Sequence, residues 1–211
     1  MFENGNLERM NFSLESLALN DVLIDTSGVF SDFMKLHLKT LRVLELITIE
    51  DFNFSQILRQ LPCLETLRVV NTPIDIYEPL TTVTRLEIEL PPLIRHFPNL
   101  KELKMTCSQF GPYQIHLWHE YFCHAHLVDI EIGNLSLLNF PSIPSMKRLK
   151  LMNVERIYVE VFYQNPQIEE LVIEKRVGPI MRYDNEIEFI SNQLPGLKLL
   201  EIVGGKVCRR Y

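Results

Sequence analysis

The apolar residues of this chain follow a frame that repeats along its length. In residues 100–105 the frame reads leucine, two variable residues, leucine, one variable residue and another apolar residue, with Pro98 two positions ahead. In a β-strand, positions 4 and 6 of this frame point to the same side, so each frame predicts a short strand with one buried face. With the first apolar residue as position 1, the frame begins at Leu14, Leu41, Leu64, Val83, Leu100, Leu127, Met146, Ile168 and Leu197.

Successive frames begin 27, 23, 19, 17, 27, 19, 22 and 29 residues apart. A period in the twenties built on this frame is typical of leucine-rich repeats. One such unit cannot bury its apolar face alone, so neighbouring units stack. We therefore predict an α/β fold: a leucine-rich repeat solenoid of about nine repeats, with a curved parallel β-sheet and with helices and turns on its convex side. All of residues 1–211 are expected to form one such domain.

The segments between frames predict helices or turns. Helical spacing of apolar residues favours helices over residues 30–39, 54–61 and 115–126, and a turn or short helix fits residues 91–98. Asn185 and Glu188 resemble a capping box ahead of a last helix. Prolines two residues before position 1 are expected to end the preceding helix and to deliver an extended chain to the sheet; they are Pro62, Pro98, Pro144, Pro166 and Pro195. Position 8 is expected to turn a small polar side chain inward, as at Thr48, Asn71, Cys107, Asn134 and Asn153.

Composition narrows the classes of partner and compartment. The chain is 46% hydrophobic with a net charge of −6, which argues against nucleic acid or an anionic membrane as partner. Residues 1–20 contain no apolar signal core, and no apolar run is long enough to span a membrane. The four cysteines show no paired spacing, which favours reduced thiols and a cytoplasmic or nuclear protein. An extracellular receptor fragment, the alternative, would carry glycans at Asn11 or Asn53.

Charged residues occupy the outward positions 3 and 5, which are expected to line the concave face of the sheet. Neighbouring strands lie about 4.8 Å apart, so each charge is expected to face an opposite one. Such columns favour either lateral ion pairs that keep the sheet soluble and in register, or a docking surface of mixed charge for one protein partner. Position 5 reads Glu45, Arg68, Glu87, Lys104, Glu131 and Lys150, and position 3 reads Arg85, Glu102, Asp129, Arg148 and Glu170.

Apolar residues also occupy outward positions in the last two repeats. Val172, Leu199 and Val203, with Met152 nearby, could anchor a partner, or they could be covered by something outside this chain. The predicted protein-binding residues are Arg68, Arg85, Glu87, Glu102, Lys104, Asp129, Glu131, Arg148, Lys150, Val172, Leu199 and Val203.

Residues 116–126 contain four of the six histidines and Cys123. On a helix, His116 and His126 would lie about 15 Å apart, too far to share one zinc ion, whereas His119 and Cys123 supply only two of its four ligands. The chain lacks glycine-rich phosphate loops and the common hydrolase and zinc motifs. We expect no enzyme, no catalytic residue, no cofactor, no metal and no small-molecule substrate; a metal protein using this segment is the less favoured alternative.

The frames with a leading proline, at residues 61–67, 97–103 and 194–200, resemble the leucine-rich repeats of F-box proteins. In that family an F-box segment binds the adaptor of a cullin ubiquitin ligase, and the repeats select the substrate. Only about a dozen residues precede Leu14, so we expect the F-box itself to be absent from this chain. The resemblance implies a protein-interaction module and suggests the substrate-recognition part of such a ligase. A free-standing repeat scaffold or adaptor unrelated to ubiquitination is the alternative.

Overall fold

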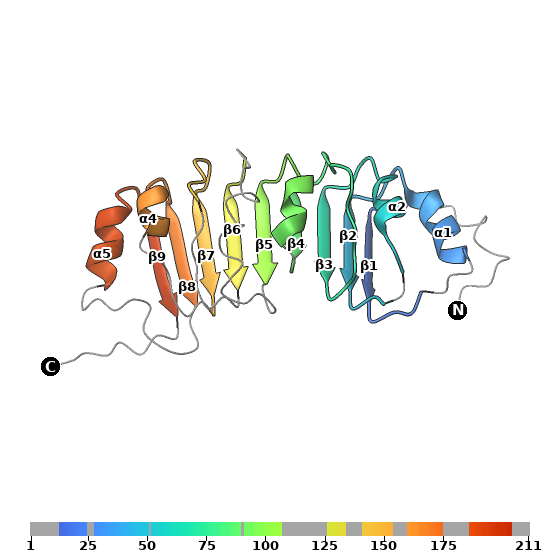
Figure 1. Cartoon of the computed structure of the whole chain (residues 1–211), viewed down its shortest axis with the longest axis horizontal. Coiled ribbons are helices and arrows are strands. Elements are labelled where there is room, and N and C mark those ends of the chain that lie inside the picture. The colour runs from blue at the N-terminus through green and yellow to red at the C-terminus, as the bar shows by residue number, and fades with distance from the viewer. Residues whose placement is uncertain are drawn as a thin grey trace. The chain divides into compact units, whose positions relative to one another are not determined.

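The computed structural model describes residues 13–24, 28–50, 52–89, 91–106, 126–133, 141–153, 160–174 and 186–203. Within these ranges nine parallel strands follow chain order in one sheet, as in a leucine-rich repeat solenoid, which confirms the predicted fold class (Figure 1). The elements are β1 (Ser16–Asn20), α1 (Val29–His37), β2 (Val43–Ile47), α2 (Ser55–Leu58), β3 (Thr66–Val70), β4 (Arg85–Ile88), the 3-10 helix η2 (Pro91–His96), β5 (Glu102–Thr106), β6 (Asp129–Gly133), β7 (Arg148–Met152), α4 (Glu160–Gln164), β8 (Glu170–Glu174), α5 (Glu186–Gln193) and β9 (Leu199–Val203).

The chain forms two compact units. The first comprises Met1–Glu87 and His96–Asn99, and the second comprises Ile88–Arg95 and Leu100–Tyr211. In the first, β1, β2 and β3 pair so that position 4 lies beside position 4, as with Leu44 and Leu67. In the second, β5 to β9 pair in the same register. Residues at the same position of the frame therefore form columns across the strands of each unit.

Positions 1, 4 and 6 form the core, as the frame predicts. From β2 to β8 these side chains are buried; Leu41, Leu44 and Leu46, for example, have no exposed surface. On β1 and β9 the side chains at positions 4 and 6 are only half-buried. Among the described strands, the apolar side chains are therefore buried most completely in strands that have a neighbouring strand on both sides. Stacked repeats are expected to behave in this way.

Four of the prolines before the strands follow the ends of α2, η2, α4 and α5, as predicted, but a tight turn comes between each proline and the extended strand. The amide of Leu64 donates a hydrogen bond to the carbonyl of Leu61 (3.3 Å), three residues earlier, and Met146, Ile168 and Leu197 make the equivalent bond. Proline therefore occupies the second position of a β-turn, where its fixed φ is favoured. Each turn still separates the preceding segment from the strand.

The residue at position 8 also differs from its prediction. Asp21, Thr48, Asn71 and Asn153 have φ between 47° and 53°, in the left-handed region. Asparagine and aspartate tolerate this conformation better than most residues, which accounts for Asp21, Asn71 and Asn153 but not for the β-branched Thr48. Asn71 is exposed and does not point inward. Cys107 and Asn134 lie outside the described residues.

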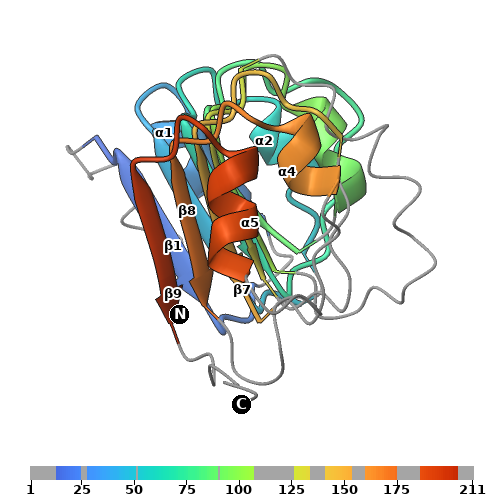
Figure 2. The same ribbon diagram turned by 90° about the vertical axis from the view of Figure 1, so that its left-hand side faces the viewer.

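Helices pack on the apolar face of the strands in each unit. In the first unit, Phe30 of α1 packs edge-on against Phe52 and Phe54, with ring centroids 5.3 and 6.1 Å away. In the second, α4 and α5 lie on one side of β7, β8 and β9 (Figure 2), and the rings of Tyr163 and Phe189 pack edge-on. The helix predicted over residues 30–39 is confirmed as α1. The helix predicted over residues 54–61 is shorter than expected and corresponds to α2, and the short helix predicted within residues 91–98 corresponds to η2. The helix predicted over residues 115–126 and Asn185 of the predicted capping box lie outside the described residues.

Asn165 is a buried polar residue at a core position that is apolar in other repeats. Three residues before position 1, where other repeats bury Leu61, Phe97, Ile143 or Leu194, the eighth repeat has Asn165, with no exposed surface. Asn165 Oδ1 accepts a hydrogen bond from the Ile143 amide (2.8 Å), and its Nδ2 donates to the Val161 carbonyl (2.8 Å). This side chain therefore ties α4 to the segment that leads into β7.

Candidate functional site

We call the sheet face formed by positions 3, 5 and 7 of the repeats the ladder face. It lies opposite the apolar positions 4 and 6 that contact the helices, because side chains alternate along a strand. All twelve residues of the predicted binding set are on described strands, and eleven of the twelve are half-buried or exposed. The twelfth, Val172, is considered below.

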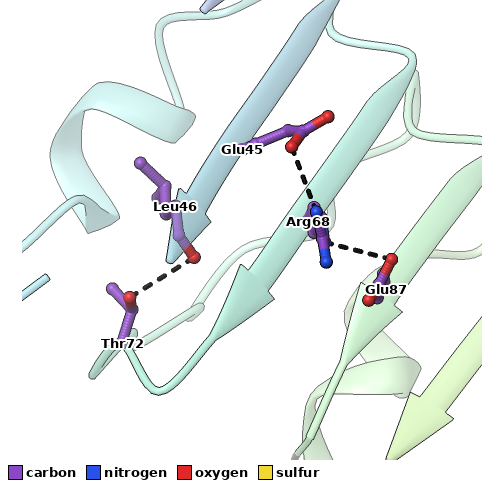
Figure 3. Close-up of polar contacts among 5 residues, drawn as sticks. All are labelled: Glu45, Leu46, Arg68, Thr72 and Glu87. Atoms are coloured by element: carbon purple, nitrogen blue, oxygen red, sulfur yellow. Dashed lines mark hydrogen bonds and ion pairs between the residues drawn. The ribbon is translucent and has the colours of Figure 1, made fainter. Parts of the chain in front are cut away.

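In the first unit, Arg68 is the centre of an ion-pair network that spans three strands. Its Nη1 lies 3.3 Å from Glu45 Oε2 on β2, and its Nε lies 3.1 Å from Glu87 Oε2 on β4 (Figure 3). The Arg68 side chain is 37% exposed, so solvent screens these pairs and each contributes about 0–1 kcal/mol. The alternation predicted for position 5 is confirmed here. Arg85 is exposed at the start of β4.

Thr72, which follows β3, hydrogen-bonds to backbone groups at the ends of β2 and β3. Thr72 Oγ1 accepts a hydrogen bond from the Ile49 amide (3.1 Å) and lies 3.1 Å from the Val70 carbonyl oxygen. It also lies 3.4 Å from the Leu46 carbonyl oxygen (Figure 3). Thr72 is 7% exposed. The bonds join the chain leaving β2 to the chain leaving β3, and so help to fix the spacing of the strands that carry Glu45 and Arg68.

In the second unit, position 5 begins with an ion pair between Lys104 and Glu131, 3.5 Å apart. Lys150 lies beside Glu131 in register, but its Nζ extends to Glu174 Oε1 (2.9 Å), at position 7 of the next strand. The hydrogen bond to Glu174 raises the pKa of Lys150, and Glu131 adds to the effect. Lys150 extends there because the next residue in its own column is Val172, which offers no charge.

Position 3 does not alternate in sign as predicted. Arg148 pairs with Asp129 (3.2 Å) on one side and with Glu170 (3.3 Å) on the other. Glu102, however, lies directly beside Asp129 in register, so two carboxylates are neighbours. Burial raises the pKa of Asp129, and Glu102 contributes to that rise, whereas Arg148 opposes it. At this end of the column two carboxylates therefore lie side by side, and Arg148 offsets part of the effect of burial and of Glu102 on Asp129.

A further row of ion pairs, not predicted, lies at position 2, at the rim where the strands begin. Arg42 pairs with Glu65 in the first unit, and Glu169 pairs with both Lys147 (2.9 Å) and Lys198 in the second. Hydrogen bonds from Lys198 and Lys147 lower the pKa of Glu169 to about 2. These residues share one register in the frame and alternate in sign, a signal that the sequence does contain.

The apolar anchor predicted in the last repeats is smaller than expected. Val172 is 7% exposed, so it is not available to a partner, and its neighbours in the column are Lys150 and Glu201. Met152 is half-buried, and its side chain lies against Gly133 on the neighbouring strand: a Cβ atom added to Gly133 would lie 3.3 Å from Met152 Cε. The exposed apolar residues that remain are Leu199 and Val203, at 45% and 46%.

Metal binding at residues 116–126 stays untested, because all but the exposed His126 lie outside the described residues. Within the described ranges no group of three or more His, Cys, Asp or Glu side chains is placed to hold a metal ion. Cys63 is a half-buried free thiol, and the other three cysteines fall outside those ranges. A search of the described helices finds none with the length and apolar character needed to cross a membrane.

A scan against models of known protein families finds no match for this chain. A search of curated proteins finds no match either.

Proposed function

We propose that this chain is a protein-interaction module that binds a partner through the ladder face. The observation that supports this most strongly is the pair of ion networks centred on Arg68 and Arg148, whose side chains are 37% and 51% exposed. Both present arginine beside carboxylates on a regular sheet. Arginine is prominent among the residues that dominate binding energy at interfaces, because its planar fork pairs with carboxylates in two directions.

The expected partner carries charges of both signs at strand spacing. In the second unit, an acidic side chain of the partner would contact the exposed Arg148, and a basic side chain would meet Glu102 and Asp129, which lie side by side in register. In the first unit, an acidic side chain would contact the exposed Arg85. Leu199 and Val203 supply an apolar contact at the side of β9. This combination of apolar contact and polar surround is common at non-obligate interfaces.

The test is a double charge reversal, Arg85→Glu with Arg148→Glu. Partners bound by the wild-type chain are identified by quantitative mass spectrometry and then purified for affinity measurement. The matched control is Lys35→Glu with Lys39→Glu, which makes the same change in net charge at α1 and just after it. We expect the first variant to weaken binding by roughly thirtyfold or more, in keeping with loss of a central arginine contact, and the control to bind as wild type.

Reversal at Arg148 places three carboxylates side by side and could disturb the fold. Circular dichroism of each variant checks this, and the milder pair Arg85→Gln with Arg148→Gln removes the charge without repulsion. Binding that is unchanged in both folded arginine variants would exclude the ladder face as the docking surface, and the charged columns would then be structural ion pairs only.

The finer hypothesis, that the module selects substrates for a cullin ubiquitin ligase, is supported by the resemblance of its frames to F-box leucine-rich repeats. Native protein isolated from cells should then co-purify with the cullin adaptor, and the ladder-face partner should have a longer half-life when this protein is depleted. A partner whose half-life does not change would favour the alternative of an adaptor unrelated to ubiquitination. Zinc analysis of untagged protein tests the remaining alternative, in which residues 116–126 bind metal.

A further inference from the structure

A cavity of about 430 Å³ opens on the helix side of the first unit. Its lining comes from α1, from α2 and the residues flanking it, and from the chain after β3, and it includes no residue of the ladder face. Its volume falls in the range of pockets that bind small molecules. The lining side chains used below are Ser31, Phe52, Ser55, Gln56, Arg59 and Tyr77.

Two aromatic side chains form its apolar part. Phe52 is held by edge-on packing against Phe54 and Phe30, with ring centroids 4.7 and 5.3 Å away. Tyr77 is 68% exposed, and the Arg59 guanidinium lies over its ring, 5.8 Å from the centroid. One ring is therefore fixed by the core and the other is accessible from solvent, so a flat ring could pack against either.

The polar part of the cavity favours an anion. Among its described lining residues, only Arg59 carries a formal charge. Arg59 Nη1 lies 3.5 Å from Glu78 Oε1, a long contact between half-exposed and exposed side chains, and the remaining N–H groups of the guanidinium can bind a second anionic group. Gln56 is exposed at the same opening.

Ser55 provides an independent sign of a missing ligand. It is 7% exposed, it lines the cavity, and its Oγ is buried with no hydrogen-bond partner among the described residues. Its amide is already satisfied by Asn53 Oδ1 (2.8 Å). Buried hydroxyls in proteins are nearly always hydrogen-bonded, and an orphan one needs an explanation.

We propose that this cavity binds a small planar aromatic molecule that carries one anionic group, either a carboxylate or a phosphate. The ring packs against Phe52 and Tyr77, the anionic group binds Arg59, and a ligand oxygen pairs with the Ser55 hydroxyl. Binding of this ligand is separate from protein binding at the ladder face, because the two sites share no residue.

The test is a titration of the full ¹⁵N-labelled chain, followed by amide chemical shifts, with four probes: benzoate, phenyl phosphate, benzyl alcohol and inorganic phosphate. We expect saturable shifts at Gln56, Arg59 and Tyr77 for benzoate or phenyl phosphate. Benzyl alcohol, which has the ring without the charge, and inorganic phosphate, which has the charge without the ring, should bind at least about tenfold more weakly. This is the factor expected for loss of one charge-assisted contact. The stronger of the two aromatic anions identifies the anionic group.

Variants separate the contributions. Arg59→Gln should weaken binding of the aromatic anion about tenfold, and Arg42→Gln, which removes an exposed arginine at the strand rim of the same unit, should not. Ser55→Ala should weaken binding without lowering the melting temperature, because the hydroxyl has no partner among the described residues in the free protein. A purely structural serine would show the opposite pattern.

Several outcomes would overturn the proposal. The first is the absence of saturable shifts at these amides up to about 10 mM probe, which is well above the range of small-molecule binding that is biologically useful. The second is equal affinity for benzyl alcohol and benzoate, or for inorganic phosphate and phenyl phosphate. The third is undiminished binding of the aromatic anion by Arg59→Gln. Tighter binding of an acidic peptide that has no aromatic residue would reassign the cavity to a peptide. None of these results bears on the ladder face, which the arginine reversals test separately.

Discussion

Replacing Asn165 by alanine should destabilise the second unit more than any surface change on it. The side chain has no exposed surface and bridges three backbone groups: it accepts from the Ile143 amide (2.8 Å) and donates to the carbonyls of Val161 (2.8 Å) and Pro141 (3.3 Å). The bonds to Ile143 and Val161 are fully buried. Gln167, half-buried beside it, donates to the Ile143 carbonyl (2.7 Å) and completes the link.

The magnitude follows from these contacts. Loss of two buried hydrogen bonds costs about 1 kcal/mol each, and the Ile143 amide left buried without an acceptor adds about 1–3 kcal/mol. We expect Asn165→Ala to lower the free energy of unfolding by about 3–5 kcal/mol. That is a large part of the roughly 5–15 kcal/mol by which proteins of this kind are stable. Gln167→Ala, which removes one half-buried bond, should cost about 1 kcal/mol.

Urea unfolding followed by circular dichroism measures the loss, and hydrogen exchange locates it. Exchange of the Ile143 amide should accelerate more than that of Leu149 and Leu151 in β7, because the bridge acts ahead of the strand. Asn165→Leu restores the apolar side chain found at this position in other repeats but not the hydrogen bonds. If Asn165→Leu were as stable as wild type, or if Asn165→Ala cost less than about 1 kcal/mol, the hydrogen bonds would not be what stabilises this region.

Three further predictions concern the ladder face and its surroundings. Glu169→Gln should flatten the decline of stability between pH 4.5 and about 2, because the lysines beside it lower the pKa of the wild-type carboxyl: its contribution is complete above the unfolded pKa and is lost as the pH falls through the folded one. Acid titration of the unfolding free energy checks this, and an unchanged slope would contradict it. Asp129→Asn should leave stability at pH 7 within about 0.5 kcal/mol of wild type or raise it, because burial raises the pKa of this carboxyl and its charge is already disfavoured; a loss above about 1 kcal/mol in urea unfolding would show that its arginine pair dominates. Thr72→Val keeps the side-chain shape but removes the acceptor of the Ile49 amide, and should cost about 1–2 kcal/mol in thermal unfolding, whereas no loss would mean that water replaces the hydroxyl.

The local pattern of the chain was enough to predict the strands. The frame places apolar residues at positions 1, 4 and 6, and each strand from β2 to β8 buries them. The first strand, for example, begins at Ser16, as the frame at Leu14 requires. Because stacked repeats pair like position with like position, the partners of Arg68 also followed from the sequence, although they lie 23 residues before it and 19 residues after it.

Side-chain partners beyond that register could not be predicted from one repeat at a time. Lys150 pairs diagonally with Glu174 because its lateral neighbour is Val172, and Val172 is buried although its position is outward. The β-turn at each proline was also not predicted. The fixed φ of proline is compatible both with a chain that leaves a helix and with the second position of a β-turn, so proline alone does not distinguish them.

What the sequence by itself determined is the order and register of the strands and the columns of charge on one face, because a period-two side-chain pattern and a recurring frame are local properties. The tertiary structure alone decided that Asn165 replaces an apolar core residue with a hydrogen-bonded bridge, and that Ser55, Arg59 and Tyr77 meet around a cavity. Those features depend on how connections of unequal length return to the sheet and on which side chains they bring together. Burial and hydrogen bonding between distant segments are set only when the neighbouring repeats are in place.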